Sequence, residues 1–128
     1  MSLSATPTYT VTYIADDAIA AFQVVAKGAG DRTVTGVTVA DGTAIGIAQH
    51  AAAAGDLVSV AVLGPSRAIA GAAIAITAML AVQGVDGKLK TAAPAAGANS
   101  YIMATPLTPA SAAGDQIIVN ISRSVMQG

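Results

Sequence analysis

The sequence contains no cysteine, and it has one histidine, three tyrosines, one phenylalanine and no tryptophan among 128 residues. Without cysteine the chain has no disulfides, no thiolate nucleophile and no cysteine-bound metal. Charged residues make up 10% of the chain, and six basic against seven acidic side chains give a net charge of −1. Nucleic-acid binding requires many phosphate contacts from clustered basic residues. Since no such cluster occurs, we expect no nucleic-acid partner.

Long hydrophobic runs are also missing. The longest nearly apolar stretch, AIAGAAIAITAMLAV at residues 68–82, is shorter than the roughly 20 residues that a spanning helix needs. The first residues, MSLSATPTYT, have neither the positive charge nor the apolar segment of a signal peptide. We therefore expect neither a membrane partner nor a secretory signal.

Small apolar side chains dominate what is present. Hydrophobic residues make up 54% of the chain, and most of them are alanine, valine and isoleucine. A chain of this length fits one domain. A core of small side chains buries little apolar area per residue, so its hydrophobic stabilisation is modest. Self-association or docking on a partner would add stability.

Turn signals divide the chain at short intervals. All seven acidic residues are aspartates, five of them next to a glycine, and both residue types favour chain reversals. The β-branched stretches between these turns predict strands at residues 9–14, 22–27, 32–39, 43–49, 57–63, 80–83, 88–91, 101–105 and 116–123. This pattern predicts a mainly β fold, a small antiparallel β-barrel or sandwich. We expect at most one short helix, at residues 70–79, and a loop at 92–99.

One local pattern occurs twice. AAAAGDLVSVAV at residues 51–62 and SAAGDQIIVNI at residues 111–121 each place a run of small residues and a Gly-Asp pair before a strand-like stretch. We interpret each copy as a tight turn that leads into a strand. Two copies suggest two equivalent edges of one β scaffold.

The N-terminus differs from the rest in composition. Residues 1–14 begin with an uncharged segment rich in serine and threonine, which cannot form a packed element alone. We expect an extended arm at 1–14 and a single β-rich domain at 15–128. The arm would add itself as a strand to a neighbouring subunit or a partner, and its contact residues would alternate between two sides: Tyr9, Val11 and Tyr13 on one, Thr8, Thr10 and Thr12 on the other. The alternative is that this segment is the first strand of the domain's own sheet.

Candidate catalytic groups are few. His50, the only histidine, has no cysteine or glutamate to complete a metal site or a triad, so we expect a surface or loop residue. The adjacent Asp16 and Asp17 would point to opposite faces of a strand, and we expect a turn rather than a carboxylate dyad. KGAGDRT at residues 27–33 lacks the phosphate-loop spacing and predicts a hairpin. We expect no catalytic residues, no cofactor, no metal site and no enzyme activity.

The order of features resembles a known family. GIA at residues 46–48, AAAAGD, VSVAVLG, LAVQGVDGKLKT at 80–91 and AAGDQIIVNI follow one another along the chain. This order, over residues 20–122, resembles the small head-decoration, or cement, proteins of tailed bacteriophages. The longer N-terminal segment and the alanine-rich stretch 68–79 depart from that pattern.

The resemblance implies a β-rich protein made in the host cytoplasm and located on the outer surface of the virion capsid. Its partners would be the major capsid protein and other copies of itself, with a trimer favoured and a dimer possible. The alternative function is a β-sandwich carbohydrate-binding or adhesion module. Such a module would need exposed aromatic residues, for which Tyr9, Tyr13 and Tyr101 are the candidates.

Overall fold

The computed structural model describes residues 6–37, 44–84 and 86–127. These residues form nine strands and contain no helix. The strands are β1 (Tyr9–Ala15), β2 (Val24–Lys27), β3 (Thr33–Gly36), β4 (Gly46–Ala48), β5 (Leu57–Ile69), β6 (Leu80–Val82), β7 (Leu89–Thr91), β8 (Asn99–Pro106) and β9 (Gln116–Gln127). The predicted mainly β class is confirmed, and each described strand falls within or overlaps a stretch predicted from the sequence.

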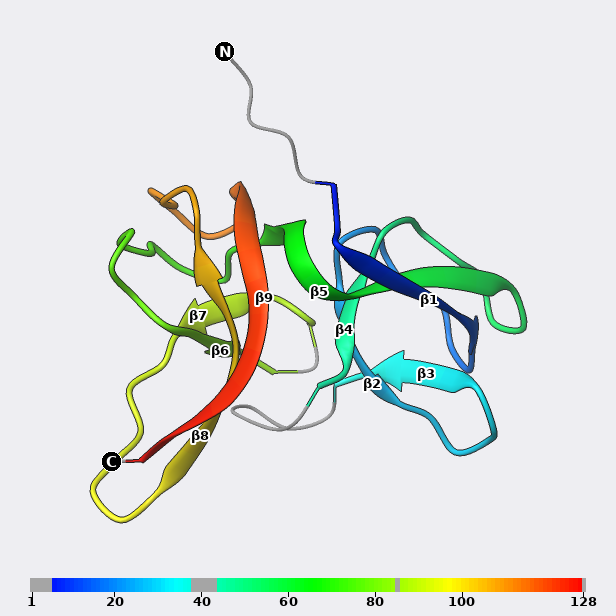
Figure 1. Cartoon of the computed structure of the whole chain (residues 1–128), viewed down its shortest axis with the longest axis horizontal. Helices are drawn as coiled ribbons and strands as arrows, with labels where there is room; N and C mark the ends of the chain where they lie inside the picture. Colours follow the sequence, from blue (N-terminus) through cyan, green and yellow to red (C-terminus); the bar gives the residue numbers. More distant parts are fainter. Residues whose placement is uncertain (1–5, 38–43, 85, 128) are drawn as a thin grey trace.

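The first five strands close into a barrel, which we call barrel 1. Its order is β1-β3-β2-β4-β5, and β1 pairs with β5 to close the ring. All of these pairs are antiparallel except β1 with β3, which is parallel. Figure 1 shows barrel 1 as the right-hand lobe of the molecule.

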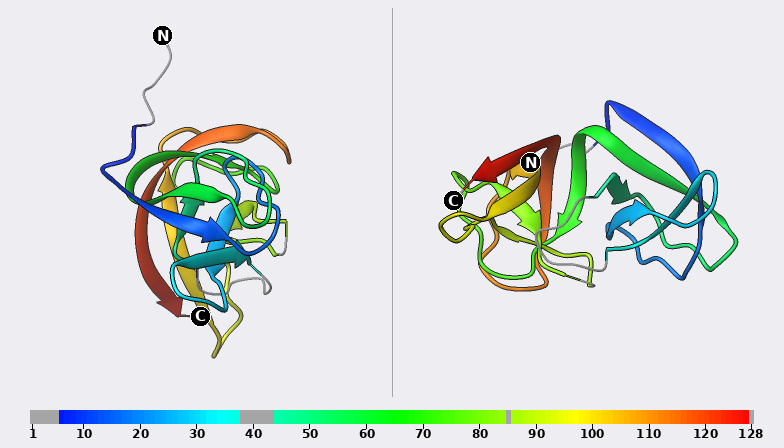
Figure 2. Two further views of the ribbon diagram at one scale, coloured as in Figure 1. Left: turned by 90° about the vertical axis from the view of Figure 1, so that its right-hand side faces the viewer. Right: turned by 90° about the horizontal axis from the view of Figure 1, so that it is seen from below.

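The remaining strands form the left-hand lobe, which we call barrel 2 (Figure 1). The order continues as β5-β9-β8-β6-β7, with every strand pair antiparallel. A single parallel bridge from Ala70 to Leu89 connects the end of β5 to β7. The view from below in Figure 2 separates the two lobes, with β5 passing from one to the other.

The two barrels repeat the same backbone contacts. Ala15 pairs in parallel with Val34 in barrel 1, and Ala70 pairs in parallel with Leu89 in barrel 2. The bridge between Ile19 and Ala52 has its counterpart between Ile74 and Ala110. The chain therefore contains an internal structural repeat, with one copy in each barrel.

The repeated Gly-Asp turn lies at equivalent positions in the two barrels. The Gly55 N–H donates to the Ala15 carbonyl at 2.8 Å, and the Gly114 N–H donates to the Ala70 carbonyl at 2.7 Å. In each case the backbone carbonyl of the aspartate that follows the glycine accepts a hydrogen bond from the N–H of the same alanine at 2.9 Å. The two copies thus belong to two barrels, whereas the sequence had suggested two edges of a single scaffold.

β5 belongs to both barrels. Its first half pairs with β1 and β4, and its second half, from Gly64 to Ile69, pairs with β9. Gly64 at the junction has a φ of +89°, a conformation that glycine adopts without steric cost. The same strand therefore closes barrel 1 and opens barrel 2.

The hydrophobic core is shared in the same way. The largest cluster of buried residues includes Val24 and Ile47 of barrel 1 and Leu80, Met103 and Ile117 of barrel 2. A second cluster lies within barrel 1, and a third, of Ala81, Ala92 and Ile102, lies within barrel 2. The two lobes are therefore one packed unit.

Residues 70–79, the candidate for the one short helix allowed by the prediction, form no helix. This segment crosses the end of barrel 2, where the N–H groups of Ala70, Gly71 and Ile74 donate to the carbonyls of Asp115, Leu89 and Ala110. N–H groups that donate to carbonyls elsewhere in the chain cannot also donate to the carbonyl four residues earlier, as a helix requires. Long-range pairing thus overrides the helix propensity of the alanines.

Residues 9–14 of the expected arm lie in β1. They pair with residues 57–63 of β5, and the Thr8 N–H donates to the Leu63 carbonyl at 3.1 Å. The expected boundary between an arm at 1–14 and a domain at 15–128 therefore falls inside a strand of barrel 1. For residues 9–14 the structure corresponds to the alternative, the first strand of the domain's own sheet. Residues 1–5 lie outside the described part of the chain.

Candidate interaction surfaces

The residues with acid–base chemistry make structural contacts. His50 is exposed; its Nδ1 lies 3.0 Å from the Ala51 carbonyl, and its Nε2 accepts the Ser59 N–H at 3.2 Å. Asp16 accepts the Ala29 N–H at 3.1 Å, and Asp17 accepts the Thr35 hydroxyl at 3.4 Å. The two carboxylates bind different residues of the β2–β3 hairpin, as expected for turn residues rather than a dyad.

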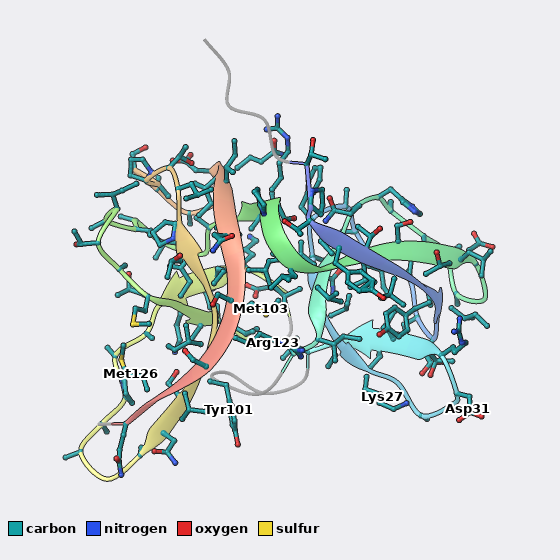
Figure 3. All side chains as sticks on the ribbon, viewed as in Figure 1. Lys27, Asp31, Tyr101, Met103, Arg123 and Met126 are labelled. Atoms are coloured by element: carbon teal, nitrogen blue, oxygen red, sulfur yellow. The ribbon has the colours of Figure 1, made fainter. Side chains whose placement is uncertain are left out.

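The segment KGAGDRT is the connection of that hairpin. β2 and β3 are antiparallel up to Lys27 and Val34, and the Gly28 N–H donates to the Thr33 carbonyl at 2.9 Å. The Gly30 N–H donates to the Thr33 hydroxyl, and Lys27 Nζ donates to the Gly30 carbonyl. Figure 3 shows Lys27 and Asp31 at this hairpin, at the far side of barrel 1. The predicted hairpin is confirmed, and its polar groups hold the turn.

Within residues 6–37, 44–84 and 86–127, no group of three or more histidine, cysteine, aspartate or glutamate side chains is placed to bind a metal ion. The same residues include no helix that is long and apolar enough to cross a membrane.

The six predicted contact residues lie at the start of barrel 1. Thr8, Tyr9, Thr10 and Thr12 are exposed, whereas Val11 and Tyr13 are half-buried. Tyr13 packs against the core cluster of barrel 1. The structure thus leaves the threonine side of β1 facing solvent, whereas Val11 and Tyr13 are half-buried and Tyr13 contacts the core of barrel 1.

An open groove lies between the two barrels, with a volume of about 540 Å³. We call it the inter-barrel groove. Three large apolar side chains at the groove are about half exposed: Leu63 at 50%, Tyr101 at 45% and Val125 at 54%. Tyr101 and Val125 are cross-strand partners on β8 and β9. The remaining lining residues are Ala44, Val62, Ile102, Met103, Ser122, Arg123 and Ser124.

Among the described residues, Arg123 is the only charged one that lines the groove. One guanidinium nitrogen donates to the Ala44 carbonyl at 3.1 Å, so the side chain bridges from β9 toward barrel 1. Figure 3 shows Arg123 and Tyr101 extending toward barrel 1, whereas Met126 lies on the opposite side of the β8–β9 ribbon. A guanidinium has five N–H donors, so the groove combines apolar walls with donors for a carboxylate or a carbonyl.

The last part of β9 borders this groove with an open strand edge. Residues 116–121 of β9 pair with β5, while residues 122–127 pair only with β8 among the described residues. An unpaired strand edge beside exposed apolar side chains is suited to binding another polypeptide. The described residues that line the groove thus offer apolar contacts and hydrogen-bond donors to a polypeptide.

This groove was not predicted from the sequence. β5 and β9 are longer than the predicted strands 57–63 and 116–123. The groove lies where β5 passes between the barrels and β9 extends beyond its pairing with β5. The mixed polar and apolar run SRSVMQ at residues 122–127 was the one available signal. This run indicates that the strand continues past its buried residues, but it does not indicate that barrel 1 lies beside the strand.

A solved structure similar to this chain is described as the crystal structure of the head fiber gp8.5 N base in bacteriophage phi29. The TM-score is 0.70, the sequences are 21% identical, and the match covers 94% of this chain and 98% of the other. At this identity the likeness concerns the fold. No curated protein matches the sequence.

A family model described as phage cement protein matches residues 4–121. The match includes barrel 1, both Gly-Asp turns and barrel 2 up to Ile121 in β9, and it confirms the resemblance found in the order of the sequence features. The family is one of structural phage proteins. The chain belongs to the phage cement proteins, which decorate the capsid.

Proposed function

We propose that the protein binds the outer surface of the major capsid protein lattice and stabilises the mature head. The family match over residues 4–121 carries this proposal. The fold supports it, because the exposed features described above are apolar side chains and an open strand edge, which suit a polypeptide partner. The absence of charge clusters in the sequence agrees with a protein surface rather than DNA as the partner.

Stabilisation of the capsid follows from binding alone. A protein that binds the mature shell but not its disrupted form stabilises the shell by about 2.7 kcal/mol per site when its free concentration is a hundredfold above its Kd. Repeated over many sites, this modest term makes the shell resistant to disruption. No chemical step is involved, so we propose no enzyme activity.

For the capsid or subunit contact we propose the exposed face of the first strand. Thr8, Thr10 and Thr12 are exposed, and β1 pairs with β3 only at Ile14 and Ala15. The strand edge at Tyr9 to Tyr13 is therefore unpaired on that side within the described chain. The residues we propose for this contact are Thr8, Tyr9, Thr10, Val11, Thr12 and Tyr13.

For the oligomer we propose a trimer, with a dimer as the alternative. Closed symmetric oligomers are the rule for soluble assemblies, and partner contacts would supplement a core built from small side chains.

The test is decoration of purified capsids that lack this protein. Bound protein should appear on the outside of the capsids by electron microscopy and should raise the denaturant concentration at which they break. Capsids that bind the protein without any gain in resistance would contradict the stabilising role. Thr10→Arg and Thr12→Arg test the first strand, with Ala113→Arg in an exposed turn as the matched control.

A carbohydrate-binding role finds less support. Of the three tyrosines, Tyr13 packs against the core of barrel 1 and Tyr101 lines the inter-barrel groove. They do not form one platform on a single strand. Binding to a glycan array with no binding to capsids would favour that alternative.

A further inference from the structure

The two Gly-Asp turns share a backbone but differ in their side chains. In the second turn the Asp115 carboxylate accepts the N–H and hydroxyl of Ser111, both at 2.9 Å, and the Ala112 N–H at 3.2 Å. Counted back four residues from the aspartate, the first turn has Ala52 and the second has Ser111, because the second turn is one residue longer after its bridge residue Ala110. Within the described residues the Asp56 carboxylate accepts no hydrogen bond, and its side chain is exposed. The carboxylate of the second turn is hydrogen-bonded within that turn, whereas the carboxylate of the first turn is exposed to solvent and to a partner.

The residue after the aspartate differs in the same sense. Gln116 follows Asp115, whereas Leu57 follows Asp56, and Leu57 is 65% exposed. Leu57 pairs across the strands with Ile14, which is 38% exposed. The first turn thus presents a carboxylate beside two apolar side chains. We call Ile14, Asp56 and Leu57 the first-turn knob.

The inter-barrel groove has the complementary chemistry. Leu63, Tyr101 and Val125 offer exposed apolar surface, and Arg123 offers guanidinium N–H groups beyond the one bound to Ala44. An arginine binds a carboxylate through parallel N–H donors. Knob and groove therefore match in both charge and apolarity.

The knob of one molecule does not lie beside its own groove. The turn before β5 lies at the right-hand end of barrel 1 in Figure 1, whereas Arg123 and Tyr101 lie between the two lobes in Figure 3. The contact must therefore form between molecules. A contact between two different patches is head-to-tail, and it closes into a ring when the rotation permits.

We propose that the first-turn knob of one copy docks into the inter-barrel groove of a second copy of this chain. Asp56 binds Arg123, and Leu57 and Ile14 pack against Leu63, Tyr101 and Val125. This inference rests on the self-association in the proposed function and is independent of capsid binding. It also assigns a role to the divergence between the two turns.

Cysteine cross-linking tests the geometry, because the natural chain has no cysteine. Leu57→Cys and Tyr101→Cys are made in separate proteins, which are then mixed and oxidised. A disulfide should form between the two variants in the mixture and in neither protein alone. Ala113→Cys, in the exposed second turn, replaces Leu57→Cys in the matched control and should give no cross-link. Cross-linking of Leu57→Cys with itself would show a symmetric contact and would overturn the proposal.

Charge reversal tests the pairing. Asp56→Arg places like charges together, and we expect self-association to weaken about tenfold or more by analytical ultracentrifugation. Arg123→Asp should do the same, and the double variant should recover most of the loss. Asp31→Arg, at the exposed β2–β3 hairpin, is the matched control and should have no effect. Equal weakening by all three single variants, or no recovery in the double variant, would refute the Asp56–Arg123 contact.

Circular dichroism on every variant confirms the fold, and capsid binding is measured separately. Wild-type protein that stays monomeric at all concentrations yet decorates capsids would overturn this inference alone. Protein that forms the cross-link but does not bind capsids would overturn the proposed function alone. If the groove instead receives a segment of the capsid protein, Arg123→Asp would reduce decoration without changing the mass of the free protein, which also refutes the proposal.

Discussion

Gly55 and Gly64 have nearly the same backbone conformation in different surroundings. Their φ values are +88° and +89°. A Cβ added to Gly55 would meet nothing within 4 Å, whereas one added to Gly64 would lie 2.6 Å from the Thr8 backbone nitrogen and 2.7 Å from its Cβ. The strain of a positive φ is common to both positions, and only Gly64 adds a clash with backbone.

We predict that Gly64→Ala destabilises the protein clearly more than Gly55→Ala does. The backbone strain alone costs on the order of 1 kcal/mol, which is the expected loss for Gly55→Ala. At Gly64 the added Cβ forces the start of β1 away from β5, so the loss should exceed that value. Urea unfolding measures both variants, and equal losses would show that the start of β1 moves away freely.

Asp115 gives a prediction for pH. Its hydrogen bonds from the Ser111 N–H and hydroxyl and the Ala112 N–H lower the pKa of the carboxyl from its usual 3.8. Because the folded pKa is lowered, the contribution to stability is fully present above the usual pKa and is lost as the pH falls through the folded value.

Asp115→Asn should therefore be less stable than the natural protein above about pH 5, and the difference should shrink toward zero in acid. Thermal unfolding across this pH range measures the difference. Asp56→Asn is the matched control, since the Asp56 carboxylate accepts no hydrogen bond among the described residues. A difference that is unchanged in acid would mean that the carboxylate of Asp115 does not stabilise the turn through its charge.

At this scale the sequence predicts local conformation well and exposure poorly. The Gly-Asp pairs indicated turns because glycine and aspartate act through their own backbone and nearest neighbours. The exposure of Leu57 depends on strands that are distant in the sequence, so the pattern LVSVAV, with Leu57 exposed and Val58 buried, did not reveal it. Arg123 had no local signal that placed it beside Ala44.

At the scale of the strand, β1 shows how topology decides the role of a segment. Alternation of side chains was predicted over residues 8–13. The burial pattern follows it at residues 10–13, where Val11 and Tyr13 are half-buried and the threonines exposed, whereas Tyr9 is exposed. The same alternation fits an arm that binds a neighbour and a strand that binds its own sheet. Which of the two forms depends on whether β5 has a free edge for β1 to pair with, and this cannot be predicted from the sequence. The helix expected at residues 70–79 does not form for the same reason, because N–H groups of this segment donate to carbonyls that are distant in the sequence.

We predict that β1 is required for folding while the residues before it are not. Deletion of residues 2–15 removes the strand that closes barrel 1 and exposes Val58 and Val60, which are fully buried. The truncated protein should lose its cooperative thermal transition. Deletion of residues 2–7, which keeps the Thr8 bond to Leu63, is the matched control and should retain it. A folded protein after deletion of 2–15 would show that another strand can close the barrel.

At the scale of the whole molecule, the repeat does not divide the chain into independent halves. β5 runs without interruption through both barrels, and the Gln49 side chain of barrel 1 donates to the buried Ser66 hydroxyl in the second half of β5 at 2.9 Å. The same core cluster contains Ile47 and Ile117. The two barrels thus bury part of their apolar surface against each other.

We therefore predict a single unfolding transition for the whole chain. Removal of barrel 2 would take away half of β5 and expose Ile47, which packs in the cluster shared by the two barrels, so barrel 1 alone would expose part of its buried apolar surface. Differential scanning calorimetry should give equal calorimetric and van't Hoff enthalpies, the mark of a two-state transition. Ile47→Ala in barrel 1 and Ile117→Ala in barrel 2, both nearly or fully buried, should each cost about 2–5 kcal/mol and lower that one transition. If either variant instead splits the transition in two, the barrels unfold separately and the shared core does not couple them.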